Sequence, residues 1–207
     1  MTSLHRVCLF LAAVAAAAPA AAASRPDPGD PNWPCVQRKV PELDVATVWA
    51  GPPVDSASTA WRDDPEVVQL VEYVAQRRVS LEEADAAVKD FAAKAGEKRA
   101  DRLGALFTGL FQKLNRERKD VMSGIDRFAT KQRKMADGLK AENADLEAMR
   151  NDSKVVFEAL QAKLDEVTLH NRIFDERQKS LTYVCEVPVL IEQRLGHVGR
   201  TIQAALK

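Results

Sequence analysis

The pattern of apolar and polar positions predicts two long helices in the second half of the chain. From residue 107 to 149 a seam position recurs at alternating intervals of four and three, and ten of its thirteen members are apolar: Phe107, Phe111, Leu114, Arg118, Val121, Ile125, Phe128, Gln132, Met135, Leu139, Glu142, Leu146 and Met149. A second seam comprises Phe157, Leu160, Leu164, Val167, Asn171, Phe174, Gln178, Leu181 and Cys185. This seven-residue repeat is typical of coiled-coil packing.

A short polar break separates the two seams. Asn151, Asp152 and Ser153 are turn-forming and helix-capping residues. Because a short connection makes consecutive helices antiparallel neighbours, we expect a first long helix in residues 98–152 to fold back onto a return helix in residues 153–207. The return helix should kink near Pro188.

The same antiparallel register has two further consequences. It places Gly104 and Gly109 opposite Gly196 and Gly199, where the two backbones could approach closely. The polar seam residues, such as Arg118, are interpreted as positions that fix the register.

Residues 59–97 predict two short helices. Asp63 and Asp64 stand directly before Pro65, which suits a helix start. Ser80 and Glu83 form a capping box for the second helix. Helices this short are unstable alone, so we expect them to pack at the base of the hairpin and leave residues 130–175 projecting.

Residues 24–58 predict an extended, proline-rich arm. Prolines at this density prevent regular helix over most of the segment. Two tryptophans, Trp33 and Trp49, favour packing of the arm on the helices. The predicted fold is therefore all-α: a long antiparallel coiled-coil hairpin with two short helices and a proline-rich arm at its base.

The first 23 residues have the features of a secretory signal peptide. Arg6 precedes an apolar run from Val7 to Ala18, and small residues follow it up to Ala23. The run is short for a membrane span, although an uncleaved anchor is the rival interpretation. We therefore expect a periplasmic or secreted protein with no stable membrane span after cleavage.

Two cysteines remain after residue 23, Cys35 and Cys185. Oxidising compartments preserve disulfides, and two cysteines allow one intrachain pairing. We expect a disulfide that joins the arm to the return helix. An intermolecular disulfide or free thiols stay open as alternatives.

Charge argues against nucleic acid as a partner. The chain has 30 basic and 30 acidic residues, so its net charge is zero. Residues 113–134 are locally basic, and a candidate basic stripe consists of Arg127, Lys131 and Lys134. Such a stripe could meet an acidic partner; the alternative is the ordinary solvated face of a helix.

The sequence contains no recognisable catalytic or cofactor-binding motif. No nucleophile has a partner base, no glycine-rich phosphate loop occurs, and His170 and His197 are isolated on helices. Asp63 and Asp64 do not match a calcium-binding loop. We therefore expect no enzyme activity, no cofactor and no metal site.

The predicted architecture favours a non-catalytic adaptor or scaffold that binds another envelope protein. The candidate binding surface is the tip of the hairpin, at Met149, Arg150, Asn151 and Asp152. A holdase chaperone and an accessory subunit of an envelope enzyme are the alternatives. The seam pattern is also compatible with a homo-oligomer.

Overall fold

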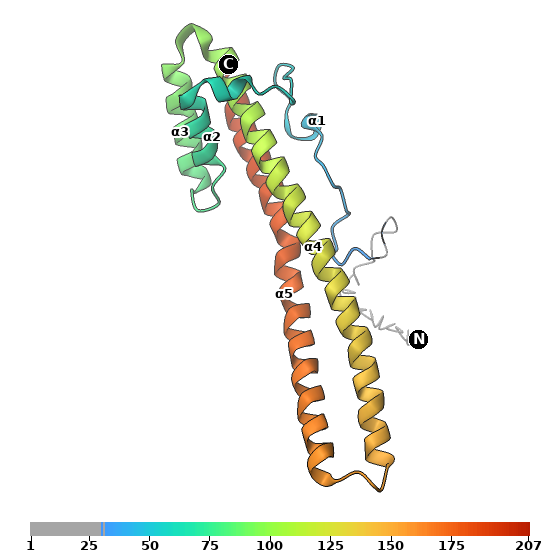
Figure 1. Ribbon diagram of the computed structural model, residues 1–207. Coiled ribbons are helices and arrows are strands. Elements are labelled where there is room, and N and C mark those ends of the chain that lie inside the picture. The colour runs from blue at the N-terminus through green and yellow to red at the C-terminus, as the bar shows by residue number, and fades with distance from the viewer. Residues whose placement is uncertain (1–29, 31) are drawn as a thin grey trace, which may run out of the picture.

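The computed structural model describes residue 30 and residues 32–207, and the predicted signal peptide, residues 1–23, lies outside the described residues. The described part of the chain is helical and has no strand. Two long helices, α4 (Arg99–Asn151) and α5 (Phe157–Ala204), pack against each other (Figure 1). The all-helical class and the long packed helices are thus confirmed.

Contacts between α4 and α5 follow opposite orders along the two helices. Arg118 binds Glu192, the side-chain amide of Gln132 donates to the carbonyl of Phe174 at 2.9 Å, and Glu142 lies 2.8 Å from His170. Residues 152–156 connect the helices at the end far from the short helices (Figure 1). Between this turn and the short helices the pair forms a stalk, which we define as residues 130–175.

The α4 seam is buried or half-buried at every predicted position. The α5 seam differs at Phe157 and Gln178, which are both exposed. The pairing of Glu142 with His170 sets a register in which Phe157 would face position 155, past the end of α4. Gln178 instead lines a small groove beneath the N-terminal segment.

The turn between the long helices is longer than the polar break predicts. The carboxylate of Asp152 accepts the backbone N–H of Lys154 at 2.9 Å, which closes a turn instead of starting a helix. Helix α5 therefore begins at Phe157, and its N-cap, Val156, makes no side-chain capping hydrogen bond. Further along, α5 continues through Pro188, which lacks the backbone N–H that would donate to the carbonyl four residues earlier.

Two short helices, α2 (Pro65–Val74) and α3 (Leu81–Lys94), pack against the ends of α4 and α5 that lie far from the turn (Figure 1). Asp64 caps α2 by accepting the backbone N–H groups of Glu66 and Val67. The Ser80–Glu83 capping box of α3 is present as predicted. The buried faces of both short helices join one apolar core with the ends of the long helices.

The N-terminal segment, residues 32–59, runs along α4 in the opposite direction and contains the short helix α1 (Val45–Val48). Lys39 contacts Asp126, and the indole of Trp49 stacks on the ring of Phe107 with centroids 4.1 Å apart. The 3-10 turn η1 (Ala60–Asp63) then leads into α2, and a second one, η2 (Gly96–Lys98), leads into α4.

The glycines near this end do not face each other as expected. A Cβ on Gly109 would lie 2.8 Å from the ring of Trp61 and from Val71, so this glycine makes room for η1 and α2. A Cβ on Gly199 would lie 3.2 Å from the carbonyl of Val48 and 3.3 Å from Phe107. Gly109 and Gly199 therefore each allow a different neighbour to approach closely. The N-terminal elements pack where the predicted register had placed the two sets of glycines opposite each other.

Among the described residues, no helix has both the length and the apolar character that a membrane span requires.

Candidate functional site

The predicted tip lies at the far end of the stalk from the short helices (Figure 1). Arg150, Asn151 and Asp152 are exposed, and Met149 is half-buried. The guanidinium of Arg150 donates to Glu147 at 2.5 Å, and the side-chain amide of Asn151 donates to the carbonyl of the same residue at 2.9 Å. These contacts are local to the last turns of α4.

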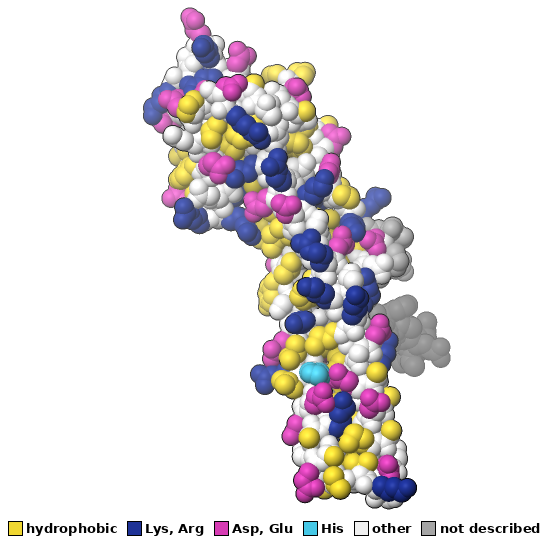
Figure 2. Space-filling view, in the orientation of Figure 1, with side chains coloured by type: hydrophobic (Ala, Val, Ile, Leu, Met, Phe, Trp, Pro, Cys, Tyr) yellow, Lys and Arg dark blue, Asp and Glu magenta, His cyan; other side chains and the backbone are white. Residues whose placement is uncertain are grey.

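Two apolar side chains, Val156 and Phe157, are also exposed at this end. Val156 is 62% exposed and Phe157 is 72% exposed. Val155, which directly precedes them in the sequence, and Met149, near the end of α4, are half-buried. Figure 2 shows apolar side chains reaching the surface at the end of the stalk, with charged side chains around them.

The predicted basic stripe is a separate surface on the stalk. Arg127, Lys131 and Lys134 are spaced four and three residues apart, which puts them on one face of α4. All three are exposed, and within the described residues none of them makes a hydrogen bond or ion pair. Lys134 is fifteen residues from Met149, or about 22 Å along the helix, so the structure does not bring stripe and tip together.

The N-terminal segment is fixed to the long helices at several points. A disulfide joins Cys35 to Cys185 of α5, with the two Cα atoms 5.5 Å apart. Lys39 extends this attachment with ion pairs to Asp30 and to Asp126 of α4, at 2.7 and 2.9 Å. Hydrogen bonding to Lys39 lowers the pKa of Asp30. The segment is thus held to both long helices.

Two buried arginines donate hydrogen bonds to distant backbone carbonyls, which the sequence pattern could not predict. Arg118 was expected to fix the helix register, and it also donates to the carbonyl of Val40 in the N-terminal segment. Arg194 donates to the carbonyls of Val74 and Val79, where α2 ends and the loop to α3 runs. Burial lowers the pKa of Arg194, but an arginine remains charged at neutral pH.

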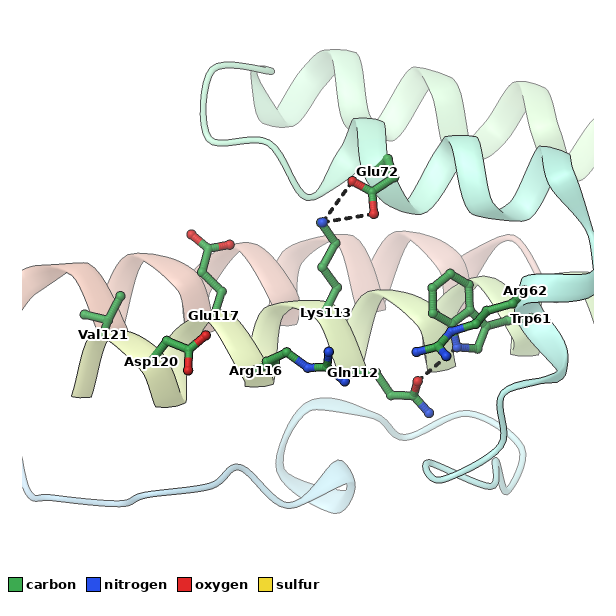
Figure 3. Close-up of a pocket in the computed structure, with 9 residues that line it drawn as sticks. All are labelled: Trp61, Arg62, Glu72, Gln112, Lys113, Arg116, Glu117, Asp120 and Val121. Atoms are coloured by element: carbon green, nitrogen blue, oxygen red, sulfur yellow. Dashed lines mark hydrogen bonds and ion pairs between the residues drawn. The ribbon is translucent and has the colours of Figure 1, made fainter. Parts of the chain in front are cut away.

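A groove of about 630 Å³ lies between α2 and α4 (Figure 3). Its lining comes from η1, α2 and α4: Trp61, Arg62, Glu72, Gln112, Lys113, Arg116, Glu117, Asp120 and Val121. Lys113 pairs with Glu72 across the groove at 2.9 Å. Glu117 lies 3.7 Å from Arg77. The sequence pattern alone does not reveal this groove, because its walls come together only when α2 packs on α4.

The two helical histidines have structural partners. His197 lies 3.1 and 3.0 Å from the two carboxylate oxygens of Asp85, and the hydroxyl of Thr201 donates to the same carboxylate at 2.6 Å. Burial acts to raise the pKa of Asp85, but the hydrogen bonds from Thr201 and His197 outweigh it and lower that pKa below its ordinary value. This cluster holds α3 to α5.

The described residues contain no group of three or more histidine, cysteine, aspartate or glutamate side chains placed to hold a metal ion. Comparisons with protein-family models, with curated proteins and with solved structures each found no match to this chain.

Proposed function

We propose that this protein is a non-catalytic, exported adaptor or scaffold whose long helices form an antiparallel coiled-coil hairpin that binds another envelope protein at its tip. The opposite order of contacts along α4 and α5 supports the hairpin. The disulfide supports export, because such bonds persist in oxidising compartments. The signal-peptide features of residues 1–23 support the same localisation.

The observation that carries the proposal is the exposure of Val156 and Phe157 at the end of the stalk. Full burial of a valine or phenylalanine side chain stabilises a protein by about 1.5–3 kcal/mol, so the fold forgoes this gain at both positions. Arg150, Asp152 and Lys154 precede the pair in the sequence and Glu158 follows it, and all four are exposed. An apolar centre with a polar rim is the usual organisation of a protein-binding surface.

The test is to place a photo-crosslinker at Arg150 and identify what it captures in the native envelope. We expect one discrete foreign protein. The purified partner should then bind the wild-type chain saturably and the Phe157→Ser variant at least about tenfold more weakly, as for loss of a buried aromatic anchor. A crosslinker at Lys140, which is exposed on α4, provides the control position. Equal binding of wild type and variant would contradict the proposal.

One observation favours a holdase chaperone as the alternative. Leu169, Tyr183 and Leu190 are exposed on α5 at intervals of fourteen and seven residues, which places them on one outer face of the helix. Apolar side chains on an outer face could shelter unfolded clients. In that case the protein would suppress the aggregation of unrelated proteins, and the crosslinker would capture a broad set of clients.

A further inference from the structure

We propose that the groove between α2 and α4 is a second partner-binding site, separate from the tip. Its occupant is an extended segment of a partner protein that has an acidic side chain at one end and a basic side chain three or four positions away. This goes beyond the adaptor proposal, because it adds a contact on the body of the protein that does not depend on the stalk.

One end of the groove carries two arginines without a carboxylate partner. The guanidinium of Arg62 lies over the Trp61 ring, 5.2 Å from its centroid, and Arg116 reaches along α4 toward Gln112 (Figure 3). Within the described residues, neither arginine forms an ion pair. Guanidinium groups beside an aromatic face are suited to binding a carboxylate.

The other end of the groove carries acidic side chains. Asp120 makes no hydrogen bond or ion pair to any described residue, although it interacts electrostatically with the adjacent Lys119. Arg116 points away from Asp120 in Figure 3, although four residues separate them on the same helix. A basic residue that precedes an acidic one gives the less favourable order for such a pair, which contributes only a few tenths of a kcal/mol. Both side chains are therefore available to a partner.

The platform at the arginine end is fixed before any partner arrives. The indole N–H of Trp61 donates to the side-chain oxygen of Gln112 at 3.0 Å. The side-chain nitrogen of Gln112 in turn donates to the carbonyls of Ser56 and Ser58, both at 2.8 Å. Because these groups are already ordered, binding immobilises fewer side chains.

The distance between the arginine end and the acidic end of the groove sets the spacing of the charged side chains in the partner segment. Gln112, which marks the arginine end, is eight residues from Asp120 on α4, or about 12 Å along the helix axis. An extended chain advances about 3.3 Å per residue, so an acid and a base three or four positions apart would reach both ends.

The test is selection of random heptapeptides, displayed on phage, against the immobilised protein with its disulfide intact. We expect enriched peptides to carry an acid and a base three or four positions apart. The double variant Arg62→Gln with Arg116→Gln should retain a synthetic selected peptide at least about tenfold more weakly, as for loss of charge-assisted hydrogen bonds. Asp120→Lys should select peptides in which an acid replaces the base. All three positions are exposed, and unchanged thermal melting would verify the fold of each variant.

Enriched peptides without a common charge pattern, or a pattern that survives these substitutions, would overturn the proposal. So would binding of inorganic phosphate alone that the double variant abolishes and Asp120→Lys leaves intact, because the groove would then be a simple anion site. The Phe157→Ser variant should select the same peptides as the wild type. A failed tip proposal and a failed groove proposal are therefore distinguishable.

Discussion

Arg118 of α4 donates its Nε hydrogen to Glu192 of α5 at 2.6 Å and a terminal N–H to the carbonyl of Val40 at 2.5 Å. Only 3% of the Arg118 side chain is exposed, whereas 36% of the Glu192 side chain is exposed. One guanidinium therefore joins both long helices and the N-terminal segment, and the carboxylate that balances its charge keeps contact with water.

Replacement of Arg118 with methionine should destabilise the fold. The change removes charge-assisted hydrogen bonds and leaves the carbonyl of Val40 without this donor, a loss of about 2 kcal/mol. Urea unfolding of the oxidised protein measures it. Lys119→Ala breaks only the exposed pair with Glu42 and should leave the urea midpoint unchanged. Equal midpoints for wild type and Arg118→Met would show that the guanidinium is not a structural tie.

The Cys35–Cys185 bond predicts that the purified protein contains no free thiol. Alkylation under denaturing conditions without reductant should leave the mass of the chain without signal peptide unchanged. The variant with both cysteines replaced by serine should be less stable by about 2–4 kcal/mol. A disulfide-linked dimer on a non-reducing gel would instead indicate pairing between chains.

Two helical glycines give a matched pair of opposite predictions. Gly109→Ala should cost about 1–3 kcal/mol, because its Cβ would lie 2.8 Å from Trp61 and Val71. Gly138→Ala should instead stabilise the protein by about 0.5–1 kcal/mol, since nothing lies within 4 Å of its Cβ. Thermal melting compares the two variants. A stabilising Gly109→Ala would show that η1 does not rest on α4.

Stability should fall in acid because of the Asp64 carboxylate. Hydrogen bonding to Arg102, at 2.8 Å, is the main cause that lowers the Asp64 pKa below its ordinary value of 3.8. A carboxylate with a lowered folded-state pKa stabilises the fold fully above its unfolded-state pKa, and this contribution is lost as the pH falls from there through the folded value. Denaturation midpoints measured from pH 6 to 2 should therefore decrease less steeply for Asp64→Asn than for wild type. Parallel curves would contradict this assignment.

Local patterns in the sequence were sufficient to predict the two long helices and the N-terminal caps of the two short ones. The seam of α4 and the capping box at Ser80 and Glu83 depend on residues within a few turns of each other. The start of α5 was misplaced because two capping residues compete there. Asp152 closes a turn on Lys154, and the helix that Ser153 could have capped begins four residues later.

The surfaces that depend on distant residues could not be predicted. Arg118 reaches Val40 across 78 positions, and Arg194 reaches Val74 across 120 positions. The groove needs Trp61 to rest over Gly109, an approach that no periodicity reveals. The tip residues were identified from the polar break, but the exposed Phe157 was assigned to the seam because its spacing fits the repeat.

The disulfide links positions 150 residues apart, which sets an order of events for a chain made from its N-terminus. At about 5–20 residues per second, Cys185 is synthesised about 8–30 s after Cys35. Once the predicted signal peptide, which contains Cys8, is removed, the thiol of Cys35 has no intrachain partner during this interval. Formation of this disulfide is therefore a late step in the maturation of this protein, because it requires that nearly the whole chain has been synthesised.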